Sequence, residues 1–329
     1  MREDSSLHQH FISGQRFKIL IVTILLSVLG YFLFTLWGGW ENVVNSIKQV
    51  GIKGIAAALG LSLVNYGLRF LRWQYFLSVL GHRIPWKPSL RIYMSGFALT
   101  TTPGKTGEAL RSVFLKDYGV PFRRSFGAFL AERLSDLLSV TLLASMGLLI
   151  YPEAWPILLI VLGMLAFIFF AVQKDSWLVW LERMAKKLLS EKYGHVIEFM
   201  LETIRSFRCC FSPAVLTTAI CFGVVAWSAE ALALYYILLL LGHDIGLLAA
   251  VFVYGFSLVI GGITLLPGGL GGAEVTMLQM LVMNGIPAAL AVAATLVIRL
   301  TTLWFSVLLG FIALPKKQIL WQKKPEGDK

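Results

Sequence analysis

Long apolar runs, separated by short polar segments, dominate this chain. A helix needs about 20 apolar residues to cross a bilayer. The pattern therefore predicts an all-α polytopic membrane protein. The full transmembrane helices are expected at about 17–37, 54–80, 123–150, 156–172, 213–241 and 287–313.

Two further apolar stretches, about 89–117 and 246–285, are interrupted by proline and glycine. Each predicts one broken span or a re-entrant hairpin. Non-helical backbone at membrane depth is tolerated only where it is buried in protein or lines a wet cavity. The residues of the two breaks are Pro103, Gly104, Gly107, Pro267, Gly268, Gly269, Gly271 and Gly272.

The basic residues decide between these readings of the breaks. Nine Lys and Arg fall within 83–133, seven within 174–208 and five within 316–329, whereas 242–298 has none. Under the positive-inside rule the three basic groups face the cytoplasm and 242–298 faces out. This assignment requires that both interrupted stretches return to the side they entered from. We therefore predict two re-entrant hairpins from opposite faces, an inverted repeat and cytoplasmic termini.

The repeat is also visible as spacing. In both copies a Glu (Glu108, Glu274) is followed by Gly at +11, Pro at +13 and Arg at +25, and the copies are 166 residues apart. A second match between the copies, with an offset of 161, is the Gly-His pair at 81–82 and 242–243. A duplicated unit that carries a break and intramembrane charges is typical of secondary transporters.

The repeated Glu and Arg are the main candidates for a site. Each Glu lies in the first helical turn after a break, where the helix dipole favours a carboxylate. Arg133 and Arg299 lie roughly 17–18 Å into their helices, near the middle of a hydrocarbon core about 30 Å thick. An arginine at that depth needs a partner. We predict the pairs Glu108–Arg133 and Glu274–Arg299, which either pin the hairpins or hold a lipid phosphate and release it.

Other charged residues extend this site. Arg111, three residues after Glu108, is predicted to be its local ion partner, and Arg69 is predicted to pair with its counterpart Glu230 across the repeat. Arg72 is expected to reach the membrane surface. The substrate-binding candidates are Glu108, Arg111, Arg133, Asp136, Glu274, Arg299, Lys105, Arg69 and Glu230.

Five segments follow from this organisation. The chain is divided into an anchor helix and outer loop (1–50), repeat one with the cytoplasmic-side hairpin (51–150), a connecting span and cytoplasmic amphipathic helices (151–212), repeat two with the outer-side hairpin (213–314) and a basic tail (315–329).

The amino-acid composition indicates which class of protein this is. Charged residues make up 14% of the 329 residues and hydrophobic ones 57%, against about 25% charged in soluble domains. The net charge of +11 lies in clusters between spans, which favours anionic lipid headgroups over nucleic acid. The sequence contains no Walker motif, HExxH, CxxC pair or GxSxG. We expect no enzyme activity, no cofactor and no metal.

Three segments together resemble a known family: Pro103-Gly104-x-x-Gly107-Glu108-x-x-Arg111, Glu132-Arg133-x-x-Asp136 and Leu266-Pro267-Gly268-Gly269-Leu270-Gly271-x-x-Glu274. They are similar to the transmembrane region of lysylphosphatidylglycerol synthases, over about residues 15–315. The resemblance implies a flippase fold with two re-entrant elements and a lipid cargo with a charged headgroup. The tail ends fifteen residues past Leu314, so we expect no aminoacyl-transferase domain and no synthesis of the lipid.

Three functions remain open at this point. The first is a lipid flippase for a polyprenyl-phosphate sugar or an aminoacylated phospholipid, integral to the inner membrane of a prokaryote. The second is a membrane-embedded transferase, or a partner subunit, that acts on lipid-linked sugars. The third is a secondary transporter of a small solute. The expected partners are membrane lipids and a glycosyltransferase or lipid-modifying enzyme.

Overall fold

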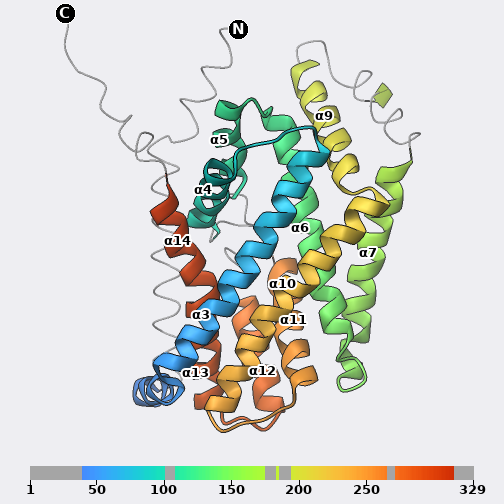
Figure 1. Ribbon diagram of the computed structural model, residues 1–329. Helices are drawn as coiled ribbons and strands as arrows, with labels where there is room; N and C mark the ends of the chain where they lie inside the picture. The colour runs from blue at the N-terminus through green and yellow to red at the C-terminus, as the bar shows by residue number, and fades with distance from the viewer. Residues whose placement is uncertain (1–38, 101–107, 175–182, 185–193, 265–270, 315–329) are drawn as a thin grey trace, which may run out of the picture.

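The fold is known from a computed structural model, which describes residues 39–100, 108–174, 183–184, 194–264 and 271–314. The regular elements within these ranges are helices (Figure 1). In chain order they are α3 (Trp40–Val79), α4 (Trp86–Gly96), η1 (Phe97–Leu99), α5 (Leu110–Phe114), η3 (Leu115–Tyr118), α6 (Phe122–Ser145), η4 (Pro152–Ala154), α7 (Trp155–Gln173), α9 (Gly194–Cys210), α10 (Pro213–Leu240), α11 (Leu247–Ile263), α12 (Gly272–Met283), α13 (Ala288–Arg299), η7 (Leu300–Trp304) and α14 (Phe305–Ala313).

Four helical stretches in the described part of the chain are long and apolar enough to cross a membrane: Trp40–Val79, Pro152–Gln173, Pro213–Leu240 and Ala288–Ala313. They contain the spans predicted at 54–80, 156–172, 213–241 and 287–313 almost completely. The span predicted at 123–150 is helix α6, which ends at Ser145 and carries five charged residues. The span predicted at 17–37 lies outside the described residues.

Both interrupted stretches form separate helices on either side of the break. The first consists of α4 with η1 before the break and α5 with η3 after it; the second consists of α11 and α12, which pack against each other. In Figure 1, α4 and α5 lie at the same end of the bundle as α9, and α12 lies at the opposite end. Of the predicted break residues, Pro103, Gly104, Gly107, Pro267, Gly268 and Gly269 lie outside the described residues.

The two copies have the same order of packed elements. Helix α10 packs along α3. In one copy α14 packs on α4 and η1, and in the other α6 packs on α11, which is the equivalent of α4 and η1. The amide of Asn65 on α3 donates to the backbone oxygen of Ala226 on α10 over 2.9 Å. These two residues are 161 positions apart, the offset of the repeat, so a residue touches its own counterpart.

One element distinguishes the copies. Residues Leu300–Trp304 form a π-helical turn directly after Arg299, whereas α6 is helical without interruption from Phe122 to Ser145. Single π turns inside α-helices occur often at functional sites.

Helix α14 packs closely on η1, because a Cβ at Gly310 on α14 would lie 2.1 Å from the backbone nitrogen of Ala98. This glycine therefore lets α14 lie directly on η1.

Candidate functional site: a charged cavity between the repeats

A cavity of about 260 Å³ lies between the two copies. Most of its lining residues come in counterpart pairs, one from each copy. The pairs are Tyr66 and Trp227, Arg69 and Glu230, Phe97 and Leu258, Thr100 and Gly261, Arg133 and Arg299, Asp136 and Thr302, Leu137 and Leu303, and Val140 and Ser306. We call this space the central cavity. Equivalent positions of the repeat therefore face a shared space.

The best-connected carboxylate of the central cavity is Asp136 on α6. It accepts hydrogen bonds from Arg72 Nη2 at 2.6 Å, from Arg69 Nη2 at 3.3 Å and from Trp227 Nε1 at 3.1 Å. Arg133 Nη2 lies 3.0 Å from its Oδ2. Three arginines thus contact the carboxylate of Asp136. The same three arginines also lie within ion-pair distance of the neighbouring Glu132.

Glu132, one turn away, is fully buried and lies behind the cavity wall. Its carboxylate contacts the guanidinium of Arg111, accepts a hydrogen bond from Arg133 over 2.9 Å, and accepts another from the Tyr93 hydroxyl over 3.1 Å. The Arg111 guanidinium also lies 4.2 Å from the ring centroid of Trp73. Buried ion pairs need this degree of hydrogen bonding and packing to offset desolvation.

Both predicted ion pairs are present. Arg133 Nη1 lies 3.4 Å from Glu108 Oε2, whose other oxygen accepts a hydrogen bond from Thr100 over 2.9 Å. Arg299 Nε lies 2.7 Å from Glu274 Oε1.

Glu274 also fulfils the predicted role at a helix start. Its Oε2 accepts a hydrogen bond from the backbone nitrogen of Gly271 over 2.7 Å, at the first turn of α12. Gly271 has a φ of 86°, which glycine adopts without steric strain. Glu274, directly after the second break, therefore contacts both the N-terminus of α12 and the guanidinium of Arg299.

Two predictions about the arginines of the first copy are wrong. Arg111 pairs with Glu132 instead of Glu108, because α5 packs against α6 and brings the guanidinium among aromatic rings. Arg72 does not reach the membrane surface. It is fully buried against Asp136, because α6 and α10 cover α3 there, and Gly223 on α10 leaves room for its guanidinium.

Two further predictions remain predictions. Arg69 and Glu230 both line the central cavity. The ion pairs recorded for Arg69 are with Asp136 at 3.3 Å and Glu132 at 3.9 Å, and Glu230 accepts a hydrogen bond from the Tyr254 hydroxyl. Lys105 lies outside the described residues.

Some residues of the cavity were not recognised from the sequence. Tyr66 donates to the carbonyl of Thr302 inside the π turn, and Trp227 donates to Asp136. These two are repeat counterparts, so the offset of 161 is the signal that marks them. The Nε atoms of Arg69 and Arg133 make no hydrogen bond within the described residues, so both side chains keep a donor for a ligand.

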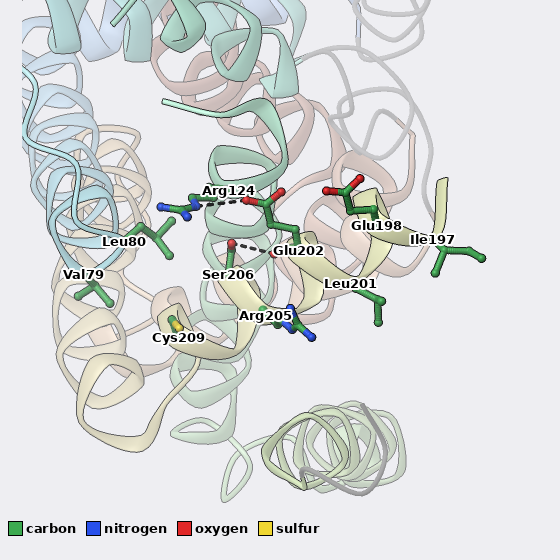
Figure 2. Close-up of a pocket in the computed structure, with 10 residues that line it drawn as sticks. All are labelled: Val79, Leu80, Arg124, Ile197, Glu198, Leu201, Glu202, Arg205, Ser206 and Cys209. Carbon is green, nitrogen blue, oxygen red and sulfur yellow. Dashed lines mark hydrogen bonds and ion pairs between the residues drawn. The ribbon is translucent and has the colours of Figure 1, made fainter. Parts of the chain in front are cut away.

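A second hollow, with a volume of about 730 Å³, lies between α9, the start of α6 and the end of α3 (Figure 2). Arg123 and Arg124 contact Glu202 of α9 here, over 3.4 and 3.3 Å. These pairs tie α9 to α6. Burial lowers the pKa of nearby His82, and the charge of Arg124 lowers it further. This groove is a surface feature, separate from the central cavity.

Comparison with known proteins identifies the family. The sequence model of the lysylphosphatidylglycerol synthase transmembrane region matches residues 18–310. A UPF0104 membrane protein of Pyrococcus horikoshii is 26% identical over 92% of this chain and 98% of its own length, and one of Methanothermobacter thermautotrophicus is 22% identical over 89% and 94%.

A more distant match covers part of the chain. The glycosyltransferase AglD of Haloferax volcanii is 28% identical over 133 residues, which are 39% of this chain and 21% of that protein. The family match covers most of the sequence, including both copies of the repeat. The chain is an integral membrane protein that belongs to the lysylphosphatidylglycerol synthase transmembrane-region family.

Proposed function

We propose that this protein is a lipid flippase that moves a lipid with a charged headgroup across the membrane, and that it does no covalent chemistry itself. The observation that carries the proposal is the central cavity, a charged space lined by equivalent positions of two repeated units. Transporters built from inverted repeats bind their substrate at such a place, near the bilayer midplane.

The size and lining of the central cavity favour a headgroup as the bound part. Sites that enclose whole small molecules usually measure about 300–1,000 Å³, and this cavity measures about 260 Å³. Apolar side chains such as Leu134, Leu137 and Val140 line it beside the charges. We propose that the acyl chains stay in the bilayer while the headgroup enters. Polyprenyl-phosphate sugars and aminoacylated phospholipids are the two candidate classes.

The proposed topology places the copies in opposite orientations in the inner membrane of a prokaryote. The α4–α5 end, which also holds α9, faces the cytoplasm with both termini, and α12 lies toward the outside. Each broken element is then a re-entrant hairpin, and six full spans surround the pair. Positive charge supports this orientation, because the basic residues gather at the α4–α9 end and are absent from 242–298.

The ion pairs suggest how a headgroup is held. A phosphate that enters the cavity competes with Glu108 and Asp136 for the guanidinium of Arg133. Removing one partner of a buried pair is strongly unfavourable unless another charge replaces it, so arginine changes partners instead of standing alone. In repeat two, Arg299 makes the same exchange with Glu274. Transport in this scheme moves the phosphate from one repeated arginine to the other.

Substitution of the two arginines tests the proposal. We expect Arg133→Gln and Arg299→Gln each to slow lipid translocation in proteoliposomes by a factor of about ten or more, since each substitution removes over ~1.4 kcal/mol of stabilisation along the path. Arg123→Gln, at the surface beside α9, is the matched control and should translocate like the wild type. Near-normal translocation by both cavity variants would refute the assigned role.

A transferase, or a subunit that assists one, is the second candidate. The partial similarity to AglD, a protein named as a glycosyltransferase, favours it. In that case a glycosyltransferase would be the partner. Incubation of the purified protein with a lipid-linked sugar donor separates the two functions. A new product would support the transferase, and translocation of an unchanged lipid would support the flippase. Transport of a water-soluble solute without any lipid movement would support a third function, solute transport.

A further inference from the structure

The lining of the central cavity is accessible along one side. Every described lining residue on α3, η1, α10, α12, α13, η7 and α14 is buried. The lining residues that are half-buried or exposed all lie on two neighbouring helices, α6 and α11, and are Arg133, Leu134, Leu137, Leu258 and Gly262. The cavity therefore reaches the surface of the molecule between α6 and α11.

The contact between α6 and α11 changes along its length. At Gly255 an added Cβ would lie 3.0 Å from the carbonyl oxygen of Val140 and 3.1 Å from the backbone nitrogen of Ala144, so the two backbones touch. About two turns further along α11, Gly262 is exposed, and a Cβ there would meet Leu137 Cδ1 at 3.8 Å as its one neighbour among the described residues. Because protein interiors are close-packed, the space beside Gly262 is an opening.

The equivalent seam of the repeat, between α14 and η1, is closed. Gly310 lets the two backbones touch there. Phe97 on η1, the counterpart of Leu258, is 2% exposed, and Leu303, the counterpart of Leu137, is 8% exposed. One of two equivalent seams is therefore open in this structure, so the opening is a property of the α6–α11 side and not of the repeat in general.

The opening has the same order of polarity as a lipid. Its mouth is formed by the apolar side chains of Leu134, Leu137 and Leu258, which contact hydrocarbon without the cost of burying a polar group. Directly behind them lies Arg133, whose side chain is 16% exposed, whereas that of Arg69 deeper inside is 6% exposed. A hydrocarbon chain at the mouth would thus place its headgroup at the arginines.

We propose that Leu134, Leu137, Leu258 and Gly262 form a lateral portal, and that a hydrocarbon chain of the bound lipid lies in it while the headgroup occupies the central cavity. This inference rests on the proposed function, since it specifies how the cargo of the same cavity is seated. The volume of the cavity, about 260 Å³, leaves the chain no place inside, so the chain has to leave through the open seam.

Photo-cross-linking tests the portal without relying on transport. The probe is a phosphatidylglycerol with a diazirine midway along one acyl chain, in vesicles of dioleoyl-phosphatidylcholine that contain the full-length protein. Mass spectrometry then locates the cross-links. We expect cross-links at Leu137 and Leu258. Their counterparts in the closed seam, Leu303 and Phe97, should yield fewer by a factor of about ten. Phe167 on α7, which is 67% exposed, is the positive control for contact with the bilayer.

Two variants narrow the portal from its two sides. Gly262→Trp places an indole ring in the opening and should reduce cross-links at Leu258 by a factor of about ten, with Phe167 unchanged. Leu137→Trp narrows the portal from α6 and should have the same effect. Gly163→Trp is the matched control, because Gly163 is an exposed glycine of α7 outside the cavity lining, and an added Cβ there meets no described atom within 4 Å. It should keep the wild-type cross-links.

Equal labelling of the two seams in the wild type, or wild-type labelling of Leu258 in both portal variants, would overturn the inference. Translocation of phosphatidylglycerol in the same vesicles separates this result from the proposed function. Portal labelling that the variants abolish, without translocation by the wild type, supports the portal and refutes the flippase. Translocation by Gly262→Trp at the wild-type rate supports the flippase and refutes the portal.

Discussion

At the scale of single residues, the buried arginines of repeat one have two different surroundings. Arg111 lies among Trp73, Tyr93 and Phe129 with its charge on Glu132, out of reach of the cavity. Arg133 lines the cavity, and its Nε makes no hydrogen bond to the part of the chain that the structure describes. The first is placed to hold helices together and the second to meet a ligand. Their substitution should therefore affect different measurements.

Arg111→Gln should lower the free energy of unfolding by about 3–5 kcal/mol, because Glu132 loses its nearest cation inside the protein. Thermal unfolding in detergent measures this loss. Combining Arg111→Gln with Glu132→Gln should recover part of it, because no carboxylate is then left uncompensated. Arg83→Gln, an exposed arginine, is the control and should change little. Equal losses for Arg83 and Arg111 would contradict a structural role for the Arg111–Glu132 pair.

Tyr254→Phe should weaken retention of lipid while leaving the fold intact. The substitution removes the hydroxyl that donates to Glu230, and loss of a hydrogen bond to a buried charge costs about 1.5–3 kcal/mol. Lipid bound per protein, counted by mass spectrometry, reports the effect. Tyr235→Phe, a tyrosine on the same helix as Glu230 but absent from the cavity lining, is the control. Unchanged lipid retention in Tyr254→Phe would show that the hydrogen bond from Tyr254 to Glu230 does not contribute to lipid binding.

At the scale of elements, the π turn of η7 is a feature of repeat two without an equivalent in α6. It places the carbonyl of Thr302 where the Tyr66 hydroxyl donates to it. A π turn holds one residue more than an α turn, so deletion of one residue restores a regular helix and leaves the helices on both sides on their original faces.

Deletion of Leu300 should therefore preserve folding and the Arg299–Glu274 pair but slow transport, because the contact between Tyr66 and Thr302 is lost. Circular dichroism checks the helix content, and translocation in vesicles checks the function. Leu300 is 49% exposed, so Leu300→Ala is a suitable control and should transport normally. Wild-type transport by the deletion variant would exclude a role for the turn.

Helix α9 packs closely on α6 and is also joined to it by ion pairs that are exposed to solvent. The side chains of Arg124 and Glu202 are 45% and 32% exposed, and pairs on such surfaces stabilise proteins by about 0–1 kcal/mol. Glu202→Gln should therefore change the unfolding free energy by less than ~1 kcal/mol, and high salt should remove the difference. A loss as large as that expected for Arg111→Gln would contradict the view of the Arg124–Glu202 pair as a weak surface ion pair.

The elements also show what the sequence can predict. Spans, breaks and the two Glu–Arg pairs follow from apolar length and a repeated spacing, which are properties of the chain itself. The partner of Arg111 does not follow from the sequence. The spacing of three residues on one helix predicts Glu108, whereas the packing of α5 on α6 brings Glu132 closer. The burial of Arg72 depends on which helices cover α3. The π turn has no signature in an apolar segment.

At the scale of the whole molecule, the inverted arrangement is directly testable. With the native cysteines replaced, Arg83→Cys should react with a membrane-impermeant thiol reagent only after the cells are opened. Asp244→Cys, in the equivalent loop of repeat two, should react from outside in intact cells, because 242–298 carries no basic residue and is expected to face out. Labelling of both positions from the same side would exclude opposite orientations of the two copies.

The contact between Asn65 and Ala226 has a consequence for the origin of the molecule. A residue that touches its own counterpart is the mark of a symmetric dimer of identical subunits, so a single-copy ancestor that inserted in both directions would have built the same axis. In such a dimer every substitution appears twice, and positions 69 and 230 would carry one and the same charge. Fusion of two copies would release them from that identity. Only then could position 69 hold an arginine and position 230 a glutamate, as they do in the lining of the central cavity.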